Sequence, residues 1–164
     1  MSNNQFLSIG SIVLLALISL RFNTTVLQNR TTEIENKVYL TAFSLADDLI
    51  EEIKQKAFDE ETVEWRSIKA DNLSSEETFG CSDPGEYSVC DFDDIDDYNN
   101  YNKEVSLPHA ENYTIISTVD YVSADDQNIK STSQTFFKRV SVVVSSPYLS
   151  YPVNVSYIFT LHSK

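Results

Sequence analysis

Near its N-terminus the chain carries a largely apolar segment, Phe6 to Leu20, in which no residue is charged. A helix rises about 1.5 Å per residue, so this segment spans roughly 22 Å of the ~30 Å hydrocarbon core of a bilayer. A helix that is apolar on every side lies either in a protein core or in a membrane. Because this segment is at the N-terminus, the pattern favours a membrane anchor over a buried core helix.

From Thr31 onward, apolar residues recur at intervals of three and four, which is the pattern of one helix face. The members of this stripe are Val38, Ala42, Leu45, Ala46, Leu49, Ile50, Ile53 and Ala57. No Gly or Pro occurs between Ser11 and Phe79, so the apolar and striped segments can form one helix. We predict this helix from about Asn4 to about Phe58, with its N-terminal half projecting from a globular domain.

The C-terminal half changes to short segments rich in Val, Ile, Thr and aromatic residues, which indicates strands. These segments are Tyr113 to Val122, Thr135 to Ser146 and Tyr151 to His162. A sheet and the striped helix each need a partner for an apolar face. The sequence therefore predicts an α+β protein in which residues 1–30 form a hydrophobic helix. Residues 31–164 form a head, with the amphipathic helix packed on an antiparallel sheet.

Charge and motifs narrow the classes of function. Twelve Lys and Arg against twenty-five Asp and Glu give a net charge of −13, which argues against nucleic acid as a partner. The chain contains no G-x-S-x-G elbow, no phosphate-binding Gly loop and no H-E-x-x-H. An anchored hydrolase is therefore the least favoured class, and we expect neither an enzyme nor a cofactor, with calcium as the one candidate ion.

The segment CDFDDIDDYNNY places five aspartates within seven positions: Asp91, Asp93, Asp94, Asp96 and Asp97. Carboxylates are suitable ligands for Ca²⁺, but the spacing is not that of an EF-hand loop. The alternative is a solvated loop in which Phe92, Ile95 and Tyr98 pack inward while the aspartates face solvent. Repulsion among the carboxylates should raise some of their pKa values, unless a metal or Lys138-Arg139 lies close enough to reverse this.

Cys81 and Cys90 flank a Pro-Gly turn, a spacing that a disulfide can bridge. In an exported protein this pair is most simply a disulfide, whereas in the cytosol it would be two free thiols. We predict the disulfide, because the N-terminal segment indicates a membrane-anchored, exported chain.

Four segments resemble a known family. Ser44 to Glu60, SLADDLIEEIKQKAFDE, is similar to the end of the long helix in minor pilins, and FDDIDDY resembles an acidic signature of the same proteins. Lys138-Arg139-Val140 and the strand Val153 to Phe159 follow as they do in that family. The chain thus resembles type IV pilin-like proteins, in particular minor pilins of the D-subunit type of the mannose-sensitive haemagglutinin pilus.

The resemblance implies a structural subunit of a type IV pilus-like or pseudopilus filament. Its partners would be other pilin-like subunits, bound through the N-terminal helix, and the inner membrane before assembly. It would be located in an extracellular filament or in the periplasm. Prepilins carry an early Glu that compensates an N-terminal amine, whereas the first Glu here is Glu33. The alternative is a membrane-anchored, non-polymerising adhesin or calcium-binding surface module.

Overall fold

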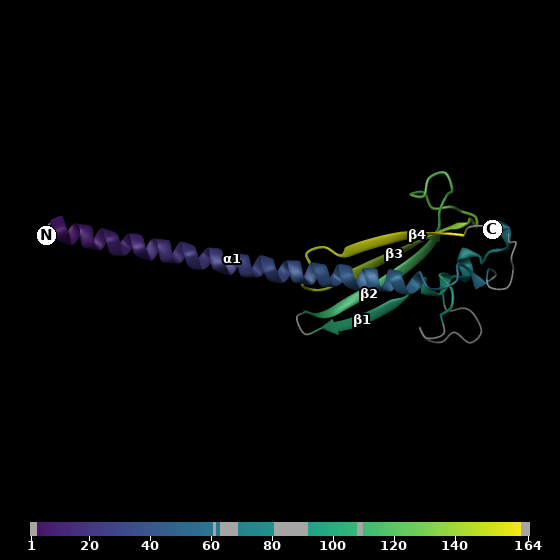
Figure 1. The fold of residues 1–164 in the computed structure, drawn as a ribbon, viewed down its shortest axis with the longest axis horizontal. Helices are drawn as coiled ribbons and strands as arrows, with labels where there is room; N and C mark the ends of the chain where they lie inside the picture. The colour runs from purple at the N-terminus through teal and green to yellow at the C-terminus, as the bar shows by residue number, and fades with distance from the viewer. Residues whose placement is uncertain (1–2, 61, 63–68, 81–91, 108–109, 162–164) are drawn as a thin grey trace. The chain divides into compact units, whose positions relative to one another are not determined.

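The computed structural model describes residues 3–60, 62, 69–80, 92–107 and 110–161 (Figure 1). The chain divides into two compact units, Met1–Lys37 and Val38–Lys164. The first unit contains only the N-terminal part of helix α1, and the second contains the rest of this helix and a sheet. We describe each unit by itself.

Helix α1 covers Asn3–Ile53, 51 residues without a break. The hydroxyls of Thr24, Thr25, Thr31 and Thr32 donate hydrogen bonds to carbonyls three or four residues earlier. These bonds let β-branched residues remain in the helix with their polar atoms satisfied. In the first unit the described residues are exposed, apart from the half-buried Val26. By length and composition this helix could cross a membrane.

The predicted end of the helix at Phe58 is wrong by five residues. After Ile53 the amides of Gln55 and Lys56 bond to carbonyls only three residues back, which tightens the last turn. The next amide, that of Ala57, donates to the carbonyl of Asp93 at 2.9 Å. The acidic loop thus supplies the acceptor that a further helical turn would otherwise have provided.

The described residues that follow form one antiparallel sheet of four strands, in the order β1-β2-β3-β4 (Figure 1). They are β1 Asn102–Leu107, β2 Ala110–Tyr121, β3 Phe137–Ser145 and β4 Val153–Thr160. The last three correspond to the three predicted segments, with ends that differ by one to three residues. Strand β1 was not predicted, because NKEVSL is a mostly polar edge strand without clear alternation.

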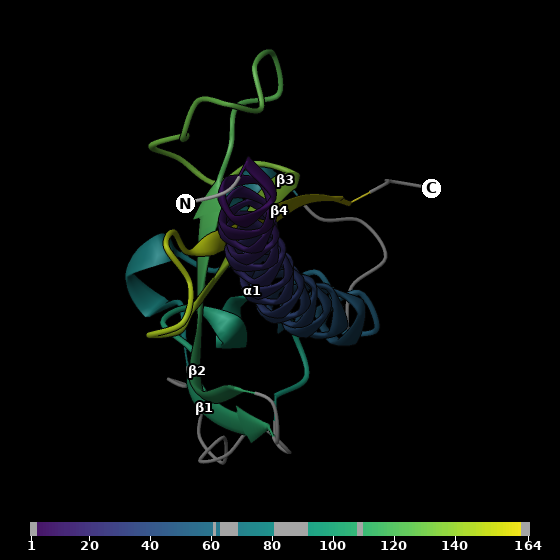
Figure 2. The same ribbon diagram turned by 90° about the vertical axis from the view of Figure 1, so that its left-hand side faces the viewer.

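The second-unit part of α1 packs on one face of the sheet (Figure 2), which confirms the α+β class. Alternate residues of β3 face the helix, as the period of two requires. The apolar stripe of the helix is buried against them. The central buried side chains are Val38, Ala42, Ala46, Leu49, Ile50, Ile53, Tyr113, Ile115, Val119, Val140, Val142 and Val144.

Candidate functional site

The acidic loop is anchored as the sequence predicts at its apolar positions. Phe92, Ile95 and Tyr98 are buried in the core of the second unit. The ring of Phe92 packs edge-on against that of Tyr98, with 5.0 Å between the ring centroids. The Tyr98 hydroxyl donates to Glu52 on α1 at 2.8 Å. The spacing of three brings these side chains together because residues 96–98 form a 3₁₀ turn.

The expectation that the aspartates face solvent is wrong for most of the loop. Asp94, Asp96 and Asp97 are 3%, 6% and 3% exposed, and among the described aspartates of this loop only Asp93 is exposed. Asp91 lies outside the described residues, as do Cys81 and Cys90, so the predicted disulfide stays a prediction. The carboxylates turn inward because backbone N–H groups and a lysine offer them hydrogen bonds that the sequence alone does not reveal.

Two of the buried aspartates hold the loop in its shape. Asp97 accepts hydrogen bonds from the amides of Asp93 and Asp94, at 3.0 and 3.2 Å. Asp94 accepts from the amides of Asp96 and Asp97, and its second oxygen accepts from the amide of Glu60 at 2.7 Å. The Asp94 carboxyl therefore joins the loop to the segment that follows α1.

The third buried aspartate, Asp96, binds a lysine that is wholly enclosed. Lys138 Nζ donates to Asp96 Oδ1 at 2.6 Å, to Asp59 Oδ2 at 2.8 Å and to the Phe58 carbonyl at 2.8 Å. Both Lys138 and Asp59 are fully buried. We call Asp59, Asp96 and Lys138 the Lys138 cluster. It connects the segment that follows α1, the acidic loop and strand β3.

The position of Lys138 follows from the alternation of β3. Counting back by twos from Val144 through Val142 and Val140, the next residue on the core-facing side is Lys138. Aromatic rings surround its ammonium group, with centroids at 4.9 Å for Phe58, 5.1 Å for Phe79 and 5.5 Å for Tyr121. A lysine on the apolar face of a β-branched strand is the sequence signal that could have located this cluster.

Asp59 also binds the segment of residues 69–80 to the cluster through Ser74. Its carboxylate accepts from the Ser74 amide at 3.1 Å and from the Ser74 hydroxyl at 3.1 Å. The Tyr121 hydroxyl donates to the Ser74 carbonyl at 2.8 Å. Both carboxylate ligands of the ammonium group are therefore themselves held in place, Asp59 by Ser74 and Asp96 by backbone bonds to Asp94 and Gly80.

The pKa values in the loop change mainly through burial. Burial, followed by the charge of Asp96, raises the pKa of Asp94 to about 9. Burial also raises the pKa of Asp96 and outweighs the opposing attraction of Lys138. The pKa values of two aspartates are thus raised, and the nearby Lys138 does not reverse the rise, but the predicted cause was wrong in its weight. The principal cause of the rise is desolvation, with like-charge repulsion a smaller contribution.

This shift makes stability depend on pH. Between the ordinary value of 3.8 and about 9 the folded Asp94 keeps a proton that the unfolded chain releases, so stability falls as pH rises. We expect Asp94→Asn to reduce the loss of unfolding free energy between about pH 6 and about pH 8 by about 2–3 kcal/mol, because a carboxyl with a pKa of about 9 keeps its proton over this range and each pH unit contributes about 1.4 kcal/mol.

Urea unfolding of the detergent-solubilised chain at several pH values measures this difference. Asp93→Asn is the matched control, since it changes an exposed neighbour in the same loop. Equal pH dependence in the wild type and in Asp94→Asn would contradict the assignment of the raised pKa to Asp94.

The calcium hypothesis stays a prediction. Among the residues that the structure describes, no group of three or more His, Cys, Asp or Glu side chains is arranged to hold a metal ion. The oxygens of Asp94 and Asp97 accept from backbone amides, and Asp96 accepts from Lys138. A calcium ion would have to compete with these donors for the same oxygens.

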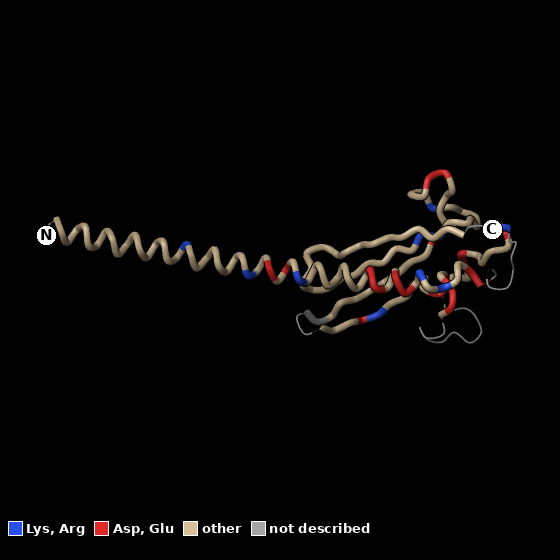
Figure 3. Tube along the Cα trace, viewed as in Figure 1, with Lys and Arg blue, Asp and Glu red and all other residues tan. Residues whose placement is uncertain are grey.

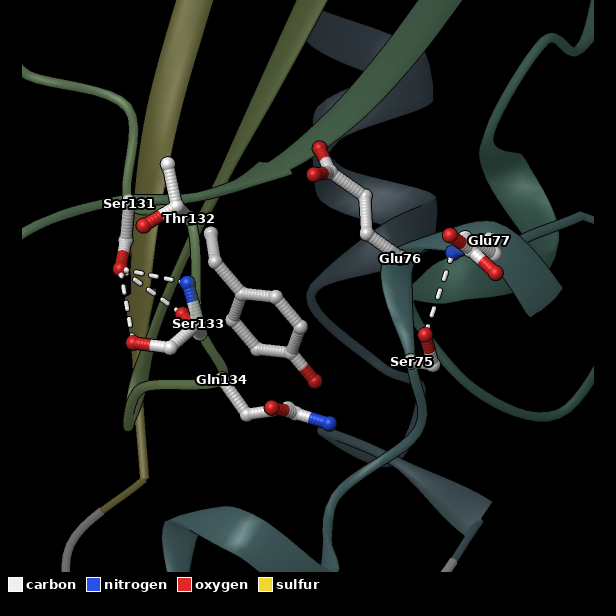
Figure 4. A pocket seen from close by; sticks show the side chains of 8 residues that line it. Ser75, Glu76, Glu77, Ser131, Thr132, Ser133 and Gln134 are labelled. Carbon is white, nitrogen blue, oxygen red and sulfur yellow. Dashed lines mark hydrogen bonds between the residues drawn. The ribbon is translucent and has the colours of Figure 1, made fainter.

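A polar pocket of about 160 Å³ lies beside the end of β2. Ser131, Thr132, Ser133 and Gln134 line one side, and Ser75, Glu76 and Glu77 line the other, as Figure 4 shows; Tyr121 also lines it. Hydroxyl, amide and carboxylate groups of this kind suit a small polar ligand. No nucleophile with an adjacent base is present among these residues.

Comparison with protein-family models, with curated proteins and with solved structures gives no match for this chain. Its function must therefore be argued from its own residues.

Proposed function

We propose that the chain is an exported, membrane-anchored subunit of a type IV pilus-like or pseudopilus filament. In this proposal the part of α1 that lies in the first unit packs against other subunits in the filament core, and the acidic sheet domain is exposed. The observation that carries the proposal is a single helix, Asn3–Ile53, whose first part is bare and apolar and whose last part belongs to a folded head.

The apolar part of the helix needs an environment that its own unit does not supply. The large hydrophobic side chains between Phe6 and Leu20 are each 49–72% exposed. A continuous apolar surface of this kind marks a membrane or protein contact. A filament subunit uses both in turn, since the helix lies in the inner membrane before assembly and against other pilin-like subunits afterwards.

The distribution of charge supports an exposed head. Acidic residues are absent before Glu33 and gather in the second unit (Figure 3). A strongly negative head stays solvated and resists non-specific association, so contacts between subunits would concentrate on the apolar helix. The same charge gives the head no attraction for nucleic acid.

The Lys138 cluster suits a head that must stay attached to its helix. It binds the segment directly after α1 to strand β3 and to the acidic loop through buried, mutually supported bonds. Force carried by the helix would reach the sheet through this junction as well as through the packed helix face. This gives the acidic motif a mechanical role in the subunit.

The proposal is tested in cells that express the full chain. We expect immunogold electron microscopy and shearing to find the wild-type chain in extracellular fibres. Ile12→Asp should remove it from both fibres and membranes, because a charge in the apolar segment opposes insertion and helix packing. Ile129→Asp is the control, since it changes an exposed apolar residue in the second unit. A wild-type chain found in membranes and never in fibres would overturn the filament proposal.

That last outcome would favour the alternative, a membrane-anchored adhesin or calcium-binding module that does not polymerise. The specific observation in its favour is the polar pocket lined by Ser131 to Gln134 and Ser75 to Glu77. A calcium-binding module would also melt at a higher temperature with calcium than with chelator, by mass action.

A further inference from the structure

The closest lysine–carboxylate contact in the Lys138 cluster joins two segments that are far apart in sequence. Lys138 Nζ and Asp96 Oδ1 are 2.6 Å apart although 42 positions separate the residues. The lysine side chain is fully buried and that of Asp96 is almost so. The described pairs Lys37–Glu33 and Lys130–Glu76 lie on the surface, where water solvates both charges.

The surroundings contain the parts of an acyl-transfer site. The amine of Lys138 is the potential nucleophile and the Asp96 carboxyl the potential electrophile. A second carboxylate, Asp59, lies 2.8 Å from the same Nζ atom and is held by the Ser74 amide and hydroxyl. The rings of Phe58, Phe79 and Tyr121 surround the amine. Nucleophile, electrophile and base thus meet in one enclosed place.

We propose that Lys138 and Asp96 form an intramolecular amide bond, with Asp59 as the proton acceptor. Asp59 takes one proton from the Lys138 ammonium group, and the freed amine attacks Cγ of the protonated Asp96 carboxyl. The new C–N bond forms, one C–O bond breaks, and the departing hydroxyl leaves as water with the second proton of Nζ. The products are a neutral amide, one water molecule and a protonated Asp59, so atoms and charge balance without a co-reactant.

Burial supports each requirement of this step. Fixing two groups in contact gives effective concentrations of about 10⁵–10⁸ M, which favours a condensation that bulk water would oppose. Burial raises the pKa of Asp96, so its carboxyl holds the proton it needs more readily than an exposed aspartate does. The reaction also removes two buried charges, whose desolvation is costly while they remain.

The bond would give the subunit a covalent connection where the structure shows only side-chain contacts. It would join β3 to the acidic loop and close a ring through β1 and β2. Such a ring would resist unfolding of the sheet under load, whatever the chain assembles with. This inference therefore stands independently of the proposed filament.

The experiment is the intact mass of the purified full chain after reduction and denaturation. We expect the wild-type chain to be lighter than its sequence requires by the mass of one water molecule. Tandem mass spectrometry should find one cross-linked peptide pair, joining Lys138 to Asp96. A wild-type chain at its full sequence mass would overturn the proposal, and so would a cross-link to Asp59.

Three variants distinguish the Lys138–Asp96 amide from a loss of water elsewhere in the chain. Lys138→Arg keeps the positive charge but cannot form the bond, so it should have its full sequence mass. Asp59→Asn removes the proton acceptor with little change in shape and should leave most molecules at full mass. Lys130→Arg changes a surface lysine that pairs with Glu76 and Asp120, and it should keep the loss of one water. Loss of water in Lys138→Arg, or undiminished loss in Asp59→Asn, would contradict the assigned roles.

Discussion

Lys138→Met should lower the free energy of unfolding by about 3–5 kcal/mol relative to wild-type chain in which Lys138 and Asp96 have not formed the amide, as expected when one partner of a buried ionic group is removed. Methionine fills much of the same volume, so the loss comes mainly from electrostatics. Asp59 would keep its bonds to Ser74 but lose its cation, and Asp96 would lose the ammonium group that donates to its Oδ1 atom. Urea unfolding of the detergent-solubilised chain, followed by circular dichroism, measures the change.

Lys130→Met is the matched control. Lys130 pairs with Glu76 and Asp120 but its side chain is 53% exposed, so its removal should cost less than about 1 kcal/mol. Adding Asp59→Asn and Asp96→Asn to Lys138→Met should recover part of the lost stability, because no buried charge is then left without a partner. Equal effects of Lys138→Met and Lys130→Met would show that burial does not govern the cluster.

Ile53→Ala should lower the free energy of unfolding by about 2–5 kcal/mol, the range for truncating a large aliphatic core residue. Ile53 is the last residue of α1 and is fully buried in the core of the second unit. Truncation removes apolar contacts and leaves a cavity next to the turn that leads to Asp59. The same unfolding measurement applies, and a lower midpoint with an unchanged urea dependence is expected.

Leu40→Ala provides the control on the same helix. Leu40 lies in the second unit but is 68% exposed, so its truncation should change stability by less than about 0.5 kcal/mol. If Leu40→Ala were as destabilising as Ile53→Ala, the side of α1 assigned to the core would be wrong.

The sequence predicted most of the elements because their signals are local. The spacing of Val38, Ala42, Leu49 and Ile53 identifies one face of α1, and its members pack on the sheet as expected. The β-branched residues of β3 and the alternation in β4 located two strands. Strand β1 escaped prediction because its polar residues belong to a sheet edge, where pairing with β2 and not hydrophobic pattern defines the strand.

The acidic loop combines features that local sequence predicts with features that depend on distant segments. The period of three in Phe92, Ile95 and Tyr98 was enough to predict which apolar side chains point inward. The burial of Asp94 and Asp96 was not predictable in this way, because charge density alone favours exposure. Their partners, the Glu60 amide and Lys138, are 34 and 42 positions away.

By itself, the sequence determined an apolar helix that continues as an amphipathic one, three of the four strands that the structure describes, and the acidic character of the head. These features follow from hydrophobic periodicity, side-chain shape and net charge, which can be read from the sequence without knowledge of distant contacts. Only the tertiary structure decided where α1 ends and which way the aspartates turn. It brought Lys138 between Asp59 and Asp96, because a buried charge is stable only where distant segments supply its partners.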